Sequence, residues 1–243
     1  MTCDILIRSY WRDLEWLAYC LDSIARFCRG FRRVIVVIPA SSRPWLDRRG
    51  PLPGWVELQH CDDSADDYLG QQITKLHADE RSDADFICHV DSDCIFCRPT
   101  EPRDLIVEGR PRIYTRPLPE LGHDWPWTEP TRDFLGWSPS HDFMQCPPFT
   151  YPRWLYPELR AWSRARHGMA LRAWVASRPP RGFSEFNVLG AWALEHHAER
   201  FEWIRAVDIG AEERHCRWYW SWGGIEAPIR AELAQLLAPG GPA

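Results

Sequence analysis

The clearest indication of the fold in this chain is the segment Phe86-Ile87-Cys88-His89-Val90-Asp91-Ser92-Asp93. It is a short apolar run with β-branched residues, which predicts a buried strand, and it ends in two carboxylates spaced two residues apart. Strands in open α/β sheets place ligands just beyond their carboxyl ends, and side chains two apart leave a strand on one face. Asp91 and Asp93 are therefore predicted at the rim of a cleft, where paired carboxylates suit a hard divalent cation such as Mg²⁺ or Mn²⁺. The alternative is a plain strand-end turn, because Asp-Ser-Asp is ordinary turn chemistry.

The residues before this stretch alternate between strand and helix patterns. Strands are predicted at 5–7, 34–38 and 55–58, with helices over 13–28 and from Asp66 or Asp67 to about residue 78. Continuous apolar strands joined by helices imply a mostly parallel sheet covered on both faces. The predicted fold class is therefore α/β, with a Rossmann-like central sheet flanked by helices.

The pattern changes after Pro99. The segment to Pro152 is rich in Pro and Trp and predicts loops and edge strands packed over the cleft, with a short strand at 112–115. The second half then becomes helical: helices are predicted over 156–177 with a break near Gly168, over 182–197 with Ser184 as the cap, and over 227–237, with a strand at 201–204. We expect one domain spanning 1–243, with halves at 1–98 and 99–237 and a frayed tail at 238–243.

Composition restricts the class of protein. No stretch reaches 18 apolar residues, and the first residues lack a basic segment followed by an apolar one, so no membrane span and a cytoplasmic location are expected. The nine cysteines then read as reduced thiols. A zinc site at Cys94 and Cys97 is disfavoured, because Cys88 and His89 would point to opposite faces of a strand and no second cysteine pair has finger-like spacing.

Charge is unevenly distributed. The formal net charge is −5, which disfavours a generally basic nucleic-acid binder, yet the segment Arg153–Arg181 carries seven arginines and one acid. This segment predicts either a local anionic partner or a solvated helical face. Lys75 is the one lysine of the chain. It shares a helix face with Gln71, distinct from the apolar face, and that stripe either faces the cleft or is solvated.

Five blocks occur in the order found in one enzyme family. They are Ile5-Leu6-Ile7-Arg8-Ser9-Tyr10, Gln71-Gln72-Ile73-Thr74-Lys75-Leu76, Asp91-Ser92-Asp93, Phe183-Ser184-Glu185-Phe186-Asn187 and Trp220-Ser221-Trp222-Gly223-Gly224. Through these blocks, which span residues 4 to 224, the chain resembles the GT-A glycosyltransferases, and most closely a bacterial and phage branch whose acceptors vary.

The resemblance implies a GT-A fold and a metal-dependent transfer of sugar from a nucleotide-sugar, with a UDP-sugar expected and Mn²⁺ or Mg²⁺ as the cofactor. It implies that Asp93 is the principal metal ligand and that Asp91 binds the donor ribose, the metal, or both. His215 is the candidate for a further metal ligand, and its alternative is a structural histidine. Donor-binding roles follow for the residues after the first strand and on the lysine helix: Arg8, Ser9, Tyr10, Gln71 and Lys75.

Glu185 is the candidate catalytic carboxylate, because it lies in the first turn of a predicted helix and an inverting transfer needs a general base. Its alternative roles are helix capping and acceptor binding. The other predicted acceptor-binding residues are Asn187, Trp220, Trp222, Arg164 and Arg166, although the tryptophans fit a packed core equally well.

Three functions stay open at this point. The first is glycosyl transfer to the hydroxyl of a saccharide or lipid acceptor. The second is transfer to a hydroxymethylated base in phage DNA, which the basic segment Arg153–Arg181 would favour. The third is a GT-A-like module that binds nucleotide-sugar without transfer. No Gly-x-Gly-x-x-Gly follows the first strand and no Gly-Lys-Ser/Thr motif occurs, which disfavours a dinucleotide oxidoreductase and a P-loop hydrolase.

Overall fold

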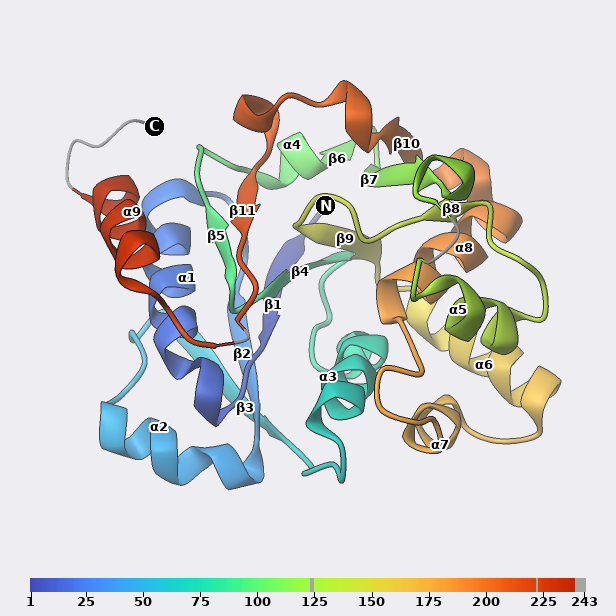
Figure 1. The fold of residues 1–243 in the computed structure, drawn as a ribbon, viewed down its shortest axis with the longest axis horizontal. Coiled ribbons are helices and arrows are strands. Elements are labelled where there is room, and N and C mark those ends of the chain that lie inside the picture. The colour runs from blue at the N-terminus through green and yellow to red at the C-terminus, as the bar shows by residue number, and fades with distance from the viewer. Residues whose placement is uncertain (123–124, 222, 239–243) are drawn as a thin grey trace.

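The computed structural model describes residues 1–122, 125–221 and 223–238 (Figure 1). Its strands are β1 Cys3–Arg8, β2 Val34–Pro39, β3 Val56–Cys61, β4 Phe86–Asp91, β5 Cys94–Phe96, β6 Ile106–Val107, β7 Arg110–Pro117, β8 His141–Asp142, β9 Phe149–Pro152, β10 Glu202–Arg205 and β11 Cys216–Trp218. Its α-helices are α1 Leu14–Phe27, α2 Arg43–Arg49, α3 Asp67–Leu76, α4 Pro102–Leu105, α5 Thr128–Leu135, α6 Leu155–His167, α7 Leu171–Ala176, α8 Glu185–His197 and α9 Ala227–Leu237.

The central sheet has the strand order β3-β2-β1-β4-β9. The first four strands run parallel and β9 is antiparallel to β4. The predicted α/β class with a mainly parallel central sheet and flanking helices is thus confirmed. Among the predicted helices, the break near Gly168 is also confirmed: α6 ends there on a left-handed residue with φ of 68°, before α7 begins.

The parallel strands β1, β2 and β4 are buried on both faces, whereas β3 at the sheet edge is partly exposed. Alternate residues of the buried strands pack into two separate cores. On one face Ile5, Ile7, Val36 and Ile38 pack under α1 and α9, while on the other Leu6, Ile35 and Val37 pack under α3, α6 and α8. Figure 1 shows α1 and α9 side by side on one flank of the sheet and the α3, α6 and α8 group on the other. The sheet is therefore held rigidly from both sides.

Two predicted caps can be compared with the structure. Asp66 caps α3, since its Oδ1 accepts a hydrogen bond of 3.0 Å from the Leu69 amide. Ser184 occupies the cap position of α8, but its side chain makes no capping bond and instead accepts from Asn187 Nδ2 at 3.0 Å. Both helices nevertheless begin where the sequence indicates.

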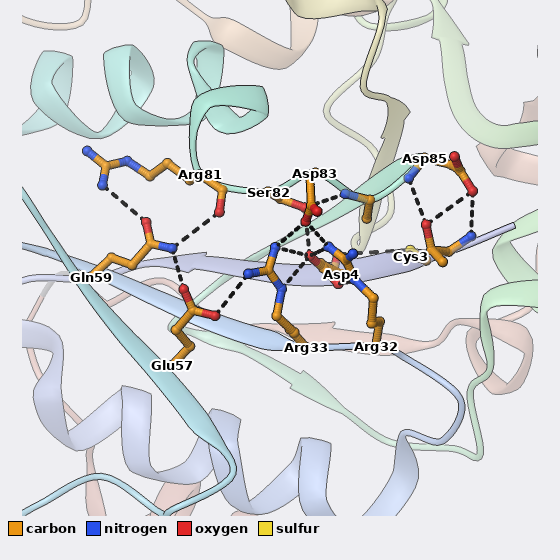
Figure 2. A network of polar contacts seen from close by, with 12 residues as sticks. Cys3, Asp4, Arg32, Arg33, Glu57, Gln59, Arg81, Ser82, Asp83 and Asp85 are labelled. Carbon is orange, nitrogen blue, oxygen red and sulfur yellow. Dashed lines mark hydrogen bonds and ion pairs between the residues drawn. The ribbon is translucent and has the colours of Figure 1, made fainter.

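An ionic network closes the amino end of the sheet, opposite the predicted cleft. Asp4 is fully buried in β1, and Figure 2 shows the guanidinium groups of Arg32 and Arg33 meeting at its carboxylate beside Ser82 and Asp83. Arg32 Nη2 lies 2.7 Å and Arg33 Nη2 lies 3.0 Å from Asp4 Oδ2. Burial raises the pKa of Asp4, but the hydrogen bonds from Arg32 and Ser82 and the Arg33 charge outweigh burial, so its pKa is lowered.

A two-stranded ribbon beyond the central sheet pairs a segment after β4 with one near the end of the chain. β5, directly after the Asp pair, pairs antiparallel with β11, so that Cys94 lies opposite Trp218 and Phe96 opposite Cys216. This pairing brings residues 219–221 back over the turn that follows β4. Within the ranges 1–122, 125–221 and 223–238, no helix combines the length and apolarity needed to cross a membrane.

Candidate functional site

The candidate site lies at the carboxyl ends of β1 and β4. These strands are neighbours, and their last residues, Arg8 and Asp91, are directly opposite each other. Side chains that follow two adjacent parallel strands meet at one edge of a sheet, where α/β proteins bind ligands. The predicted blocks at 8–10 and 91–93 are therefore brought together.

Lys75 connects this edge to α8. Its Nζ lies 2.6 Å from Asp91 Oδ1 and donates a hydrogen bond of 2.8 Å to Glu185 Oε1. Nζ also lies 4.9 Å from the centre of the Phe186 ring. Three residues chosen independently from sequence, on α3, β4 and α8, thus form one contact group.

The Lys75 side chain is buried, with 3% of its surface exposed. Burial by itself lowers the pKa of an ammonium, but the charges of Asp91 and Glu185 outweigh it, so the pKa of Lys75 is raised and the side chain is a fixed cation. Glu185 is the first residue of α8, where the helix dipole also favours a carboxylate. The predicted solvated helix face is therefore wrong for Lys75, whereas its neighbour Gln71 is half-buried.

Asp93 does not share a strand with Asp91, which corrects the expectation of two carboxylates on one strand face. β4 ends at Asp91, and Asp93 lies in the turn that leads into β5. Its Oδ2 accepts a hydrogen bond of 3.1 Å from the Ser221 amide, and its carbonyl accepts one of 2.9 Å from the Tyr219 amide. Burial, Asp91 and Asp13 together raise the pKa of Asp93 to about 8.

Asp13 is a site residue that the sequence did not single out. It follows β1 and directly precedes α1, so it looks like an ordinary helix-start residue. Burial and the charges of Asp91 and Asp67 raise its pKa to about 7, while a hydrogen bond from the Ser221 side chain lowers it. Ser221 thus touches both Asp13 and Asp93, and its position depends on the β5–β11 pairing.

Buried polar atoms without partners lie beside this edge. Among the described residues, Arg8 Nε, Ser9 Oγ and both amide atoms of Gln72 are buried and make no hydrogen bond. Arg8 is held by Asp67, with Nη2 to Oδ1 at 2.5 Å. These unpaired groups belong to the end of β1, to the residue after it and to α3, which packs against β1.

Aromatic side chains border the same edge. Tyr10 is half-buried and meets Trp11 edge-on at 6.4 Å between ring centres, and Tyr68 stacks on Trp127 at 6.0 Å. Trp220 is 69% exposed and stacks on Trp218 at 5.5 Å, so it is not part of a packed core. Trp222, the other tryptophan predicted to bind acceptor, lies outside the described residues, as do residues 239–243 of the tail predicted at 238–243.

His215 is not placed with the Asp pair, which corrects its proposed role as a metal ligand. It precedes β11, whose antiparallel pairing carries it past the far end of β5, opposite Cys97 and about 13 Å along the ribbon from Asp93. There its Nδ1 lies 2.9 Å from Thr100 Oγ1. The structural-histidine alternative fits this position.

Asn187 is also unavailable to an acceptor, which corrects that prediction. Its Oδ1 accepts from the Phe143 amide at 2.8 Å and its Nδ2 donates to Ser184 Oγ at 3.0 Å, so both ends of the amide fasten α8 to the protein. Arg164 and Arg166, on α6, are both exposed as expected for a contact residue. The Arg166 guanidinium lies 5.8 Å from the centre of the Trp162 ring.

The carboxylates fit a divalent cation only in part. Within the described ranges, no three His, Cys, Asp or Glu residues are grouped closely enough to hold a metal by themselves. Yet the four carboxylates Asp13, Asp91, Asp93 and Glu185 outnumber the cations Lys75 and Arg8 that act on them, and the pKa values of Asp13 and Asp93 are raised by burial first and by neighbouring carboxylates second. The donor set suits a Mg²⁺ or Mn²⁺ ion bound by one or two carboxylates and completed by water and phosphate oxygens. Such an ion would compete with Lys75 for Asp91.

Comparison with known proteins gave one family match. A search of curated proteins found no match. The model of the family described as "Family of unknown function (DUF6492)" matches residues 21–150, which is more than half of the chain and includes Lys75 and the Asp91-Ser92-Asp93 turn. The chain therefore belongs to the DUF6492 family.

Proposed function

We propose that this protein is a glycosyltransferase of the GT-A type, which moves a sugar from a nucleotide-sugar to an acceptor hydroxyl with the help of Mn²⁺ or Mg²⁺. A UDP-sugar is the first donor to test. The observation that carries the proposal is the contact group at the carboxyl ends of β1 and β4, in which Lys75 joins Asp91 to Glu185 beside Asp13 and Asp93.

The groups left unpaired around this edge support donor binding. Arg8 and Gln72 carry buried N–H groups without partners, which suit phosphate and ribose oxygens. Asp91 and Asp93 would hold the cation, with Asp13 adding negative charge nearby. A cation bound there would neutralise the charge that develops on the departing diphosphate.

The proposed reaction exchanges one C–O bond for another. The acceptor oxygen bonds to the anomeric carbon, and the bond from that carbon to the diphosphate breaks with its electron pair. In a single displacement the proton of the acceptor hydroxyl passes to Glu185, whose carboxylate is held in place by Lys75 and the start of α8. In the resting protein, Lys75 would neutralise the Asp91 and Glu185 side chains and keep the Glu185 carboxylate in position to receive the proton.

The direct test measures UDP binding by calorimetry with and without Mn²⁺, and sugar release from UDP-sugars. Asp93→Asn is expected to abolish the Mn²⁺-dependent part of UDP binding, because it removes the carboxylate charge but not its size. Asp22→Asn, at an exposed position of α1, is the matched control and is expected to behave like the wild type. Equal Mn²⁺-dependent binding in Asp93→Asn and wild type would refute the proposal.

Glu185→Gln separates catalysis from binding. Loss of a general base costs about 10²–10⁴-fold in turnover and leaves donor affinity nearly unchanged. Tight, metal-dependent UDP binding with neither hydrolysis nor transfer in the wild type would instead favour the non-catalytic module.

A second candidate function is transfer to a modified base in DNA. It is favoured by the exposed Arg164 and Arg166 on α6, a helix that packs against α8 and α7, which in turn lie against α3. Arg160, in the same segment, is not available to contact DNA phosphates, because it pairs with Asp79 at 2.6 Å. The test is the salt dependence of duplex DNA binding: neutralising Arg164 and Arg166 together should reduce its slope by nearly two. An unchanged slope would remove this candidate.

A further inference from the structure

A cavity lies at the other end of the β5–β11 ribbon from the Asp pair. Its volume is about 390 Å³, and its lining includes Arg98, Asp104, Arg112, Tyr114, Glu213 and His215. The register of β11 on β5 separates His215 from Asp93 by about 13 Å, so this cavity is not the site described above. It draws residues from β7, from the segment after β5 and from the segment before β11.

His215 presents an unpartnered nitrogen there. The side chain is 7% exposed, and burial together with Arg98 lowers its pKa to about 4, so the ring is neutral at pH 7. Thr100 Oγ1 donates its one proton to the Arg98 carbonyl at 3.0 Å, so His215 Nδ1, at 2.9 Å, must donate to Thr100. The hydrogen-bond network thus assigns the proton to Nδ1, and Nε2 keeps a lone pair that no described residue satisfies.

Two guanidinium groups supply donors to the same cavity. Arg98 Nη1 bonds the Glu213 carbonyl at 2.9 Å, and Arg112 uses Nε on Glu202 at 3.0 Å and Nη1 on the Asp104 carbonyl at 3.2 Å. Within the described part of the chain, neither Nη2 group has a hydrogen bond to protein. Two carboxylates, Asp104 and Glu213, also line the cavity, and Glu202 pairs with Arg112 at 3.0 Å. Asp104 Oδ2 accepts from the Glu101 amide at 2.7 Å and Glu213 is exposed, so the free Nη2 groups remain as the charged donors of the lining.

We propose that this cavity binds a small molecule that carries an oxyanion next to a hydroxyl group, such as a sugar acid or a sugar phosphate. The Nη2 groups of Arg98 and Arg112 would hold the oxyanion, since guanidinium N–H groups match carboxylate and phosphate oxygens. His215 Nε2, as an acceptor, would take the hydroxyl proton of the ligand. The volume admits one hexose-sized molecule.

The test is titration of the full chain with four probes: D-glucuronate, D-glucose 6-phosphate, D-glucose and inorganic phosphate. D-glucose lacks the charge and inorganic phosphate lacks the sugar hydroxyls. At least one of the two sugar anions, D-glucuronate or D-glucose 6-phosphate, should therefore bind tenfold or more tightly than D-glucose and tenfold or more tightly than inorganic phosphate. Glucuronate and glucose 6-phosphate distinguish a carboxylate ligand from a phosphate ligand. Binding is read by calorimetry and by the ¹⁵N resonances of the His215 ring, identified by their loss in His215→Gln.

Arg98→Gln is expected to weaken the preferred probe at least tenfold, whereas Arg103→Gln, at a highly exposed neighbouring position outside the cavity, should not change it. Thermal melting verifies that each variant is folded. The ring spectrum of the wild type needs no variant to fold: it should show Nδ1 protonated and Nε2 bare, with Nε2 shifting on binding. Failure of both sugar anions to bind, glucose binding equally well, an unchanged affinity in folded Arg98→Gln, or a proton on Nε2 would each overturn the proposal. None of these results bears on UDP binding at the Asp pair.

Discussion

Lys75 Nζ lies 2.8 Å from Glu185 Oε1, although 110 residues separate them in the chain. The same nitrogen lies 2.6 Å from Asp91, so one buried ammonium joins α3, the end of β4 and the start of α8. A buried cation between two carboxylates is costly to disturb, because removal of either sign leaves the other unpaired.

Lys75→Met should therefore destabilise the fold by about 3–5 kcal/mol, as expected when a buried ion pair loses one partner. Glu185→Gln in the Lys75→Met background should restore part of this loss, because it removes one uncompensated charge. Urea unfolding of both single variants and the double variant measures the coupling. Arg164→Met, at an exposed position of α6, is the control and should stay within about 0.5 kcal/mol of wild type. Strictly additive effects at Lys75 and Glu185 would contradict the coupling.

The Asp4 network makes a separate prediction about the amino end of the sheet (Figure 2). Asp4→Asn should cost about 2–3 kcal/mol, near the low end for a buried pair, because Arg32 and Arg33 are one-third exposed and can turn to solvent. Asp83→Asn, in the same network but with 77% of its side chain exposed, should cost much less than Asp4→Asn, because solvent screens its ion pairs. Unfolding in guanidinium chloride compares the stabilities of Asp4→Asn and Asp83→Asn. Similar losses of stability in both variants would show that the contribution of Asp4 does not depend on its burial.

The small size of Gly190 allows α8 to approach Phe143. A methyl group added at Gly190 would overlap the Phe143 ring, and Phe143 is fully buried. Gly190→Ala should therefore destabilise by about 1–3 kcal/mol despite the better helix propensity of alanine. Because α8 begins with Glu185, the same variant should also weaken the Glu185–Lys75 contact. Gly54→Ala, where the added methyl meets no atom within 4 Å, is the control for thermal melting, and equal melting points would contradict the packing argument.

Much of the central sheet could be predicted because β1, β2 and β4 are buried on both faces. A strand such as Val34–Pro39 is apolar at nearly every position, and its short length and β-branched residues distinguish it from a buried helix. β9 was missed since Phe149–Pro152 is short and bounded by prolines, which resembles a loop. Its place at the sheet edge depends on pairing with β4, a non-local contact.

The candidate site, like the sheet, could be predicted from the sequence only in part. Asp91 and Lys75 stood out because one ends a buried strand and the other is a single lysine on a helix. Asp13 did not, since its role depends on which carboxylates the fold brings near it. His215 was placed wrongly because the direction of the three-residue strand β11 decides which end of the ribbon it reaches. The presence of a histidine near the end of the chain does not indicate in which direction β11 runs along β5.

The raised pKa values of Asp13 and Asp93 predict how stability changes with pH. Both carboxyl groups titrate near pH 4 when unfolded but at about 7 and about 8 when folded, so between these values the folded state binds more protons. The free energy of unfolding should therefore fall as pH rises from about 4 to 8, by the linkage relation. The contribution of Asp4 to stability changes with pH in the opposite direction. Its pKa is lowered in the folded state, so its contribution is lost only as pH drops below about 4, outside the pH range in which Asp13 and Asp93 act.

Asp93→Asn removes one of these groups and should flatten the pH dependence. The variant should be more stable than wild type at pH 8 by about 1 kcal/mol or more, and the gain should shrink toward pH 5, where wild-type Asp93 is already protonated in the fold. Urea unfolding at pH 5, 6, 7 and 8 measures both curves, with Asp22→Asn as an exposed reference on α1. A variant curve parallel to that of wild type would mean that Asp93 ionises normally, and that its surroundings do not hold the surplus negative charge inferred from Asp13 and Asp91.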